Sequence, residues 1–269
     1  MTDRQRQSAP GHVTGRKPPA MADAALPRQH EGAGDWASWQ PHLPDALEPR
    51  DALPHRRCGL DEVGRGALAG PLVAAAVILP DNIHALLGPL APFLRDSKTV
   101  ARARRQEIAE AIRAHALALE IAIISVAEIN ARGLGWANGE VFRRLIGLVH
   151  ADEYVVDGRV RPPAPPERAG RVRCLVNADA LVPAVSAASL VAKVHRDHLM
   201  TALHNGNPAY GWASNVGYGT AAHLAALREH GPCAEHRRIF VATALGLRTK
   251  ANGRRQPASA AATPLLTED

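Results

Sequence analysis

The segment from Gly59 to Leu79 constrains the fold of this chain more than any other part of its sequence. Two adjacent carboxylates, Asp61 and Glu62, end a short apolar stretch, and a Gly-Arg-Gly turn follows them. An uncharged run at 69–79 comes next, and its β-branched residues are typical of a buried strand. These features predict two strands separated by a glycine-rich turn, with acidic side chains where the first strand ends.

The residue types around this turn suit metal and phosphate chemistry. Carboxylates at a strand end supply the oxygen ligands that Mg²⁺ prefers. The glycines on either side of Arg65 let the backbone approach a polyanion closely, while the guanidinium can bind phosphate or sugar. An ordinary β-hairpin with solvated acids explains Asp61 and Glu62 taken alone. The functional interpretation depends on the glycines and on acids further along the chain.

Composition favours one globular domain between two unstructured ends. Hydrophobic residues make up 46% of the 269 residues, which is enough for a packed core. Residues 1–54 and 249–269 lack apolar periodicity, so they cannot bury enough surface to offset their ordering entropy. We therefore expect two disordered tails and a single domain at 55–248.

Several function classes are disfavoured by composition. No apolar run reaches the roughly 18 residues of a membrane span, and the N-terminus has no signal-peptide pattern. Three scattered cysteines, Cys58, Cys174 and Cys233, form neither a disulfide framework nor a zinc pattern. We expect a cytoplasmic protein with no membrane partner, and its net charge of +6 permits a polyanionic one.

Strand-like and helix-like segments alternate inside the domain. Strands first, followed by mixed strands and helices, favour an α/β layer with helices on the faces of the sheet. The expected strands lie at 57–60, 71–79, 117–126, 153–156 and 172–176, and the expected helices at 101–116, 136–150, 183–204 and 220–230.

Acidic residues recur where these strands end. Asp61 and Glu62 follow one strand, Asp157 ends another, and Asp179 comes within three residues of a third. Because neighbouring strands lie about 4.8 Å apart, acids at like ends of strands can converge on one site. Four carboxylates there would repel one another unless cations neutralise them, and two divalent ions can clamp the reacting oxygens of a phosphodiester. Each aspartate alone is more typical of a turn; the coincidence of position predicts the site.

Six blocks of the sequence resemble, in order, those of bacterial type 2 ribonuclease H, or ribonuclease HII. The resemblance extends from about Cys58 to Leu247. It implies a ribonuclease-H-like fold, a mixed five-stranded sheet flanked by helices with a helical C-terminal part. The blocks are DEVGRG at 61–66, DSK at 96–98, VVDG at 155–158, SAASLVAKVHRD at 186–197, GYGT at 217–220 and EHRRIF at 235–240.

The resemblance also implies an activity. It is that of an endonuclease, dependent on Mg²⁺ or Mn²⁺, which cuts the RNA strand of RNA/DNA hybrids and incises duplex DNA at embedded ribonucleotides. The products carry 5′-phosphate and 3′-hydroxyl ends, and we expect the enzyme to be a monomer. Two divalent ions would be held by Asp61, Glu62, Asp157 and Asp179.

Other residues would bind the nucleic acid. By resemblance, the Gly64-Arg65-Gly66 turn reads a ribose 2′-hydroxyl through its backbone, and Tyr218 stacks on the deoxyribose that follows. A protein that tells RNA from DNA does need contact with the 2′-hydroxyl. Lys98 and Lys193 are two of the few lysines in the chain, and their place inside the blocks favours phosphate contacts.

Spacing in the long helix leaves two interpretations open. Ser186, Ser189 and Lys193 are three and four residues apart, so they share one helix face. That face could line the nucleic-acid groove, and packing of small residues on the sheet explains the serines equally well. Arg237 and Arg238 could bind phosphate or an acidic partner inside the protein.

A few features depart from the motifs or add nothing to them. We interpret the histidines, among them His236, as surface residues or as neighbours of the site, because they show no zinc spacing. Arg159 stands where the family commonly has Asn, and Asn177-Ala178 where it commonly has Lys-Gly. These two departures affect the charge and fine geometry around the acids rather than the acids themselves.

Two alternatives to ribonuclease HII need to be weighed. Ribonuclease HIII typically has Gly-Lys-Gly in place of Gly-Arg-Gly and an additional N-terminal binding domain, for which residues 1–54 are too short and too polar. A nucleic-acid-binding protein that keeps the fold without cutting would be favoured if one of the four acids were missing. All four are present.

Overall fold

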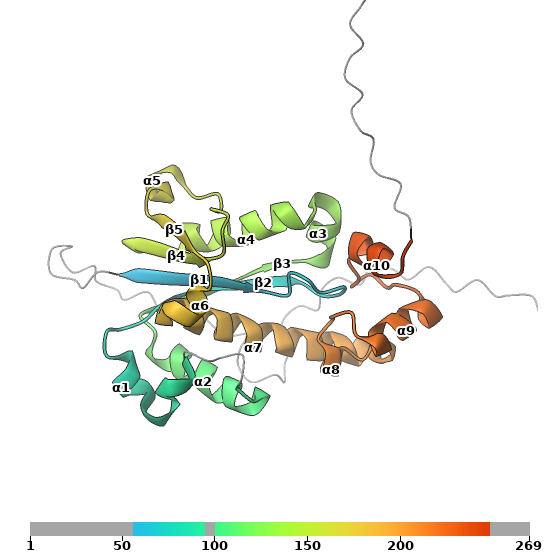
Figure 1. Ribbon diagram of the computed structural model, residues 1–269, viewed down its shortest axis with the longest axis horizontal. Helices are drawn as coiled ribbons and strands as arrows, with labels where there is room; N and C mark the ends of the chain where they lie inside the picture. Colours follow the sequence, from blue (N-terminus) through green and yellow to red (C-terminus); the bar gives the residue numbers. More distant parts are fainter. Residues whose placement is uncertain (1–55, 95–99, 248–269) are drawn as a thin grey trace, which may run out of the picture. The chain divides into compact units, whose positions relative to one another are not determined.

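The computed structural model describes residues 56–94 and 100–247, which form a five-stranded sheet with helices on both faces (Figure 1). The strand order is β3-β2-β1-β4-β5. β1 pairs antiparallel with β2 and parallel with β4, so the predicted mixed sheet is confirmed. The strands are β1 (Arg57–Val63), β2 (Leu72–Ile78), β3 (Ala118–Ile124), β4 (Glu153–Asp157) and β5 (Val172–Leu175).

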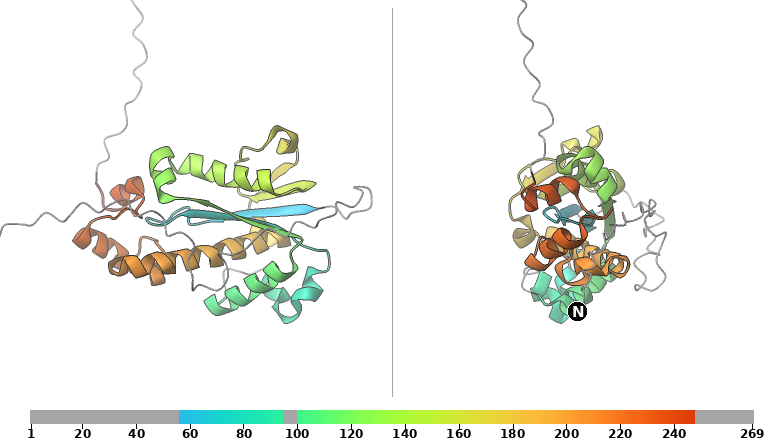
Figure 2. Two further views of the ribbon diagram at one scale, coloured as in Figure 1. Left: turned by 180° about the vertical axis from the view of Figure 1, so that it is seen from behind. Right: turned by 90° about the vertical axis from the view of Figure 1, so that its right-hand side faces the viewer.

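Two long helices cover the opposite faces of this sheet (Figure 1, Figure 2). α4 (Leu134–Leu148) lies on one face and α7 (Pro183–Gly206) on the other. Every residue of β2 is buried, as its uncharged sequence predicts, because both of its faces are covered. The core under α4 is aliphatic with two aromatic rings; it includes Leu60, Leu72, Ile124, Phe142, Leu145 and Tyr154.

Short helices complete the two layers and the C-terminal part. α7 extends past the sheet into a group of helices that packs around Tyr210, Trp212 and Met200. In the described residues, no helix has the length and apolar character needed to cross a membrane. The remaining helices are α1 (Ile83–Leu87), η2 (Gly88–Leu94), α2 (Arg102–His115), α3 (Val126–Arg132), α5 (Pro166–Ala169), α6 (Ala178–Leu181), η3 (Pro208–Tyr210), α8 (Trp212–Asn215), α9 (Ala221–His230) and α10 (Arg238–Ala244).

The observed elements differ from the predicted ones at several places, and short helices such as α1, α5 and α6 lie where none was predicted. β1 continues to Val63, so Asp61 and Glu62 lie inside the strand rather than after it. The strand predicted at 117–126 stops at Ile124, and α3 begins instead. Between the helices predicted at 183–204 and 220–230, where the sequence predicts neither helix nor strand, the chain forms η3 and α8. The predicted tails and Lys98 lie outside the described residues.

A capping box explains why β3 ends where it does. The Ser125 hydroxyl accepts a hydrogen bond from the backbone N–H of Glu128, and the Glu128 carboxylate accepts one from the backbone N–H of Ser125 at 2.9 Å. These bonds satisfy donors that the first turn of a helix otherwise leaves free. The spacing Ser-x-x-Glu is visible in the sequence, and it outweighs the β-branched residues on either side.

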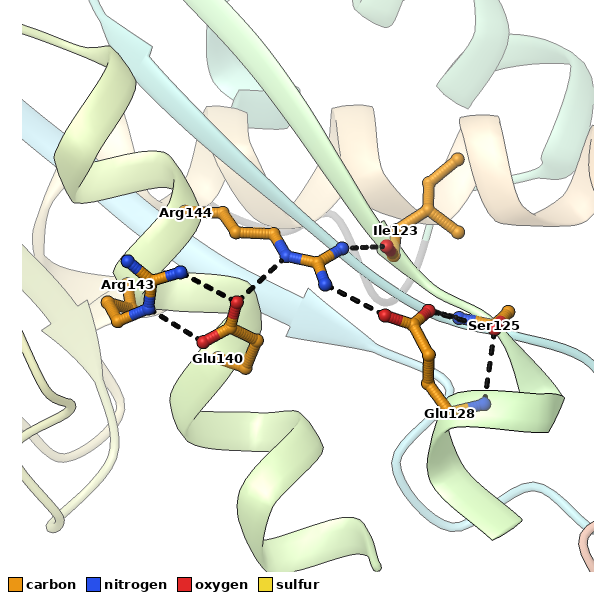
Figure 3. Close-up of polar contacts among 6 residues, drawn as sticks. All are labelled: Ile123, Ser125, Glu128, Glu140, Arg143 and Arg144. Atoms are coloured by element: carbon orange, nitrogen blue, oxygen red, sulfur yellow. Dashed lines mark hydrogen bonds and ion pairs between the residues drawn. The ribbon is translucent and has the colours of Figure 1, made fainter. Parts of the chain in front are cut away.

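Arg144 extends this box into a network that joins α3, α4 and β3 (Figure 3). Its guanidinium donates to Glu128 at 2.8 Å, to Glu140 at 3.1 Å and to the carbonyl oxygen of Ile123 at 3.1 Å. Hydrogen bonds from Arg143 and Arg144 hold the pKa of Glu140 down at about 2. One side chain thus fixes the end of β3 against both helices.

Two substitutions of Glu128 separate the cap from the ion pair. Glu128→Gln keeps a side-chain acceptor for Ser125 and loses the charge that faces Arg144. We expect it to lower the free energy of unfolding by about 0.5 kcal/mol, because ion pairs near the surface contribute little. Glu128→Ala also loses the cap and should cost about 1.5 kcal/mol. Urea unfolding measures both, and equal costs would show that the capping box contributes nothing.

Candidate active site

Asp61 and Asp157 lie side by side at the ends of two paired parallel strands. In the register of β1 and β4, Leu60 is opposite Val156, and the two aspartates occupy the next position on each strand. Side chains alternate along a strand. Leu60 and Val156 point into the core under α4, so both aspartates point toward the face covered by α7. The parallel pairing therefore brings these two acids together, as predicted.

Asp61 is a buried carboxylate, and its hydrogen bonds fix its orientation. It is 8% exposed, and its Oδ1 accepts from the backbone N–H of Glu62 at 2.8 Å. The pKa of Asp61 is raised to about 7, mainly by burial and also by the charges of Glu62 and Asp157, against a hydrogen bond from the Ser189 side chain that lowers it. Ser189, predicted to contact nucleic acid, thus also holds the central acid of the site.

Glu62 links the acids to the Gly-Arg-Gly turn. Burial raises its pKa, while the guanidinium of Arg65 lowers it and the charge of Asp157 raises it. The Arg65 guanidinium lies 3.7 Å from the Glu62 carboxylate, and the Arg65 side chain is 64% exposed. Arg65 is therefore available to a partner in solution while it still faces the acids.

Asp157 in turn fixes the short helix that carries Asp179. Its Oδ1 accepts a hydrogen bond from the backbone N–H of Ala178 at 2.8 Å, and Asp179 follows in the first turn of α6. Asn177 has a φ of 57°, a left-handed conformation that Asn tolerates better than most residues. Asn177-Ala178 stands where the family commonly has Lys-Gly. It forms a left-handed turn at Asn177 and supplies the Ala178 N–H that bonds Asp157.

The acids fit a divalent cation by charge and by ligand type. The charges of Glu62 and Asp157 raise the pKa of Asp61, and the charge of Asp157 raises that of Glu62, so a cation would relieve the repulsion among these carboxylates. Carboxylate oxygens are also the ligands that Mg²⁺ and similar ions prefer. Across residues 56–94 and 100–247, no three His, Cys, Asp or Glu side chains are grouped closely enough to hold a metal ion.

Buried Arg237 holds the Gly-Arg-Gly turn from inside. Its guanidinium donates to the carbonyl oxygen of Arg65 at 3.0 Å and twice to that of Gly70, at 3.0 and 2.8 Å. The pKa of Arg237 is lowered to about 9, first by burial and then by the nearby charge of Arg196. Arg237 is fully buried and bonds main-chain carbonyls, so neither of its two predicted roles is correct.

Arg196 of α7 supports the same turn and also Tyr218. It donates to the carbonyl oxygens of Pro71, Ala69 and Val216 at 2.8 to 3.0 Å. Gly64 has a φ of 89°, and a Cβ there would overlap the Arg196 side chain, so this position needs glycine for two reasons.

Tyr218, which the sequence predicts to contact nucleic acid, lies beside the same scaffold. Its ring is half-buried and lies 5.5 Å from the Arg196 guanidinium. The preceding carbonyl, that of Gly217, accepts hydrogen bonds from the backbone N–H groups of Leu68 and Ala69, at 2.8 and 3.2 Å. The peptide before Tyr218 is therefore hydrogen-bonded to residues 68–69, which follow the Gly-Arg-Gly turn.

The remaining predicted contacts have mixed outcomes. Lys193 is paired with Asp197 on its own helix, and its side chain is 26% exposed, so a phosphate contact stays a prediction. Ser186 is buried and donates to the carbonyl oxygen of Leu94, which is the packing role rather than the groove role. His236 is also buried, so its interpretation as a surface residue is wrong.

Known proteins match this chain over most of the described region. A family model described as Ribonuclease HII matches residues 58–243. A ribonuclease HII of Burkholderia thailandensis is 44% identical over 222 residues, which cover 82% of this chain and 95% of that protein. One of Burkholderia pseudomallei (strain 1710b) is 45% identical over 185 residues, covering 68% and 82%.

Solved structures show the same fold. The ribonuclease HII of Archaeoglobus fulgidus, solved in complex with PCNA, superimposes with a TM-score of 0.59 at 27% identity, covering 72% of this chain and 98% of that one. The ribonuclease H2 of Pyrococcus horikoshii gives a TM-score of 0.56 at 21% identity, covering 70% and 96%. At that identity the second likeness shows the fold alone.

The buried carboxyl of Asp61 predicts a pH-dependent stability in protein freed of divalent ions. Its pKa is 3.8 ordinarily and about 7 in the folded protein. The folded state therefore binds its proton more tightly, and stability should fall as the pH rises from about 4 to about 7. Asp61→Asn removes this loss, so above pH 7 it should be more stable than wild type, by at most about 4 kcal/mol.

Urea unfolding in EDTA between pH 4 and pH 8 measures the difference. The exposed Asp81→Asn is the matched control and should follow wild type throughout. Added Mg²⁺ or Mn²⁺ should stabilise wild type more than Asp61→Asn. If Asp61→Asn were less stable than wild type at pH 8, the idea that position 61 buries an unneutralised charge would be wrong.

Proposed function

Because this chain belongs to the ribonuclease HII family, as its sequence blocks predicted, we propose that it incises duplex DNA at embedded ribonucleotides as well as cutting RNA/DNA hybrids, using two divalent metal ions. Family membership supports an endoribonuclease that acts on RNA/DNA hybrids, and enzymes of this family depend on a divalent metal. The finer parts of the proposal are the two ions, Mg²⁺ or Mn²⁺, the incision at single ribonucleotides, and the 5′-phosphate and 3′-hydroxyl products. We also expect a cytoplasmic monomer.

The observation that supports this most is the pairing of Asp61 with Asp157 beside Glu62. We propose that these three acids and Asp179 hold the ions. When bound, divalent ions would activate a water molecule and stabilise the charge that develops on the phosphate. The protein supplies the orientation: Ser189 and the Glu62 backbone fix Asp61, and Ala178 fixes Asp157.

The neighbouring turn supplies a surface on which a sugar can be read. Gly66 is exposed, and the space where its side chain would be is empty within 4 Å, so a ribose can approach the main chain. The exposed guanidinium of Arg65 suits a phosphate on the same strand. Tyr218 would stack on the next sugar, and Lys98 and Lys193 would contact phosphates.

Cleavage assays test the catalytic part. Duplexes labelled at one end should be cut at a single embedded ribonucleotide and within a continuous hybrid when Mg²⁺ or Mn²⁺ is present, and an all-DNA duplex should stay intact. Asp157→Asn should lower kcat by orders of magnitude while hybrid binding survives. A variant that cuts at nearly the wild-type rate would contradict the role given to Asp157.

Substrate choice tests the role of Tyr218. Tyr218→Ala should lower kcat/KM at a single embedded ribonucleotide about 5- to 150-fold, the loss expected for one stacking contact, and lower it less within a continuous hybrid. Tyr218→Phe keeps the ring and should retain most of the activity. Equal losses on both substrates would leave Tyr218 as a packing residue.

A further inference from the structure

A chain of buried hydrogen bonds connects Cys233 to the backbone of Tyr218 through two imidazole rings. His223, in α9, and His236, which precedes α10, are 0% and 1% exposed. Their Nε2 atoms lie 3.1 Å apart. Nδ1 of His223 lies 2.9 Å from the carbonyl oxygen of Tyr218, and Nδ1 of His236 lies 3.0 Å from the backbone nitrogen of Cys233. Neither imidazole belongs to the acidic site.

The partners of the two rings determine which nitrogens carry protons. The Tyr218 carbonyl oxygen can only accept, so Nδ1 of His223 is the protonated nitrogen. Nε2 of His223 is then an acceptor, and the indole N–H of Trp212 donates to it at 3.2 Å. Nδ1 of His236 accepts from the Cys233 backbone N–H, so the proton of His236 is on Nε2 and points at His223.

Both rings are therefore neutral and oriented by their neighbours. Burial lowers the pKa of each imidazole, which is consistent with one proton on each ring. The aromatic rings of Tyr210 and Trp212 pack around His236, with ring centroids 4.6 and 5.3 Å away. His223 cannot turn over without losing its bond to Tyr218 and leaving a buried donor unpaired.

Tyr218 needs such an anchor because it lies between two glycines. Gly217 has a φ of 84° and is fixed on its side by Leu68 and Ala69. Beyond the tyrosine, the peptide that leads to Gly219 is fixed through the Tyr218 carbonyl, which accepts from His223 and from the backbone N–H of Thr220 at 2.9 Å. The Tyr218 N–H donates to the Asn215 carbonyl oxygen at 2.9 Å, so the His223 bond fixes the peptide on the far side of the tyrosine, where Gly219 would otherwise allow it to turn.

We propose that His223 is a positioning residue for Tyr218, and that His236 holds His223 in the orientation this requires. The pair thereby sets where the Tyr218 ring stands relative to the Gly-Arg-Gly turn, and with it the enzyme's preference for a ribonucleotide followed by DNA. This inference rests on the stacking role proposed for Tyr218.

Two substitutions separate the two nitrogens of His223. His223→Asn places an amide N–H near the position of Nδ1 and so keeps a donor for the Tyr218 carbonyl. His223→Gln places its amide near the position of Nε2, which keeps a partner for His236 and loses the donor to Tyr218. Both remove one buried ring, so both should lose similar stability, and a purely structural role would affect them equally.

The measured quantity is the ratio of kcat/KM on a single embedded ribonucleotide to kcat/KM on a continuous hybrid. We expect His223→Asn to keep this ratio within about twofold of wild type and His223→Gln to lower it about tenfold, the direction expected for Tyr218→Ala. A change in folded fraction alone would lower both rates together and leave the ratio unchanged. An unchanged ratio in His223→Gln, with a lowered one in Tyr218→Ala, would overturn the positioning role.

Two further results would contradict the positioning role of His223. If Tyr218→Ala itself leaves the ratio unchanged, the stacking role is wrong and there is no ring position for His223 to control. If neither variant folds, nitrogen NMR of the wild-type imidazoles decides instead. His223 should be neutral with its proton on Nδ1, and His236 neutral with its proton on Nε2; a His223 protonated on Nε2 would contradict the proposed bond to Tyr218.

Discussion

The close packing of α7 on β1 is the constraint on which the rest of the structure depends. A side chain at Gly59 would overlap the main chain of Ala184 and Val185, so strand and helix meet backbone to backbone. From that contact the helix advances about 1.5 Å per residue along the sheet. It brings Ser189 to Asp61 and, two turns later, Arg196 to Gly64. One helix thus positions both the acids and the turn beside them.

This arrangement contains two groups of like charge: acids on β1 and β4, and arginines under the Gly-Arg-Gly turn. The charges of Glu62 and Asp157 raise the pKa of buried Asp61, and the charge of Asp157 raises that of Glu62, so a divalent cation would relieve the repulsion. Arg196 and Arg237, buried under the turn, donate their hydrogen bonds to main-chain carbonyls, and Asp197 is an acid whose charge acts on Arg196. Buried positive charge of this kind costs stability, and it favours a polyanion on the surface above. The energetic cost of the interior is therefore consistent with a site that binds metal and nucleic acid together.

Local patterns in the sequence predicted the sheet and the acids but not the polar interior. The uncharged run that became β2 is a local signal, and so is each acid at the end of a strand-like segment, because each is recognised from residues next to it in the chain. Arg237 was missed because its partners, Arg65 and Gly70, lie more than 160 positions away in the chain. His223 and His236 were missed for a similar reason, since their roles depend on hydrogen bonds across the C-terminal helices. The end of β3 could have been predicted, because Ser125 and Glu128 have the spacing of a capping box.

A crystal structure of Asp61→Asn bound to duplex DNA with one embedded ribonucleotide, grown with Mg²⁺, tests the account most directly. In that crystal the ribose 2′-hydroxyl should contact the main chain of the Gly64-Arg65-Gly66 turn. The Tyr218 ring should lie on the following deoxyribose, and the scissile phosphate should stand beside Glu62 and Asp157. A duplex bound with its ribonucleotide away from the turn, or with its phosphate away from these acids, would contradict this binding mode.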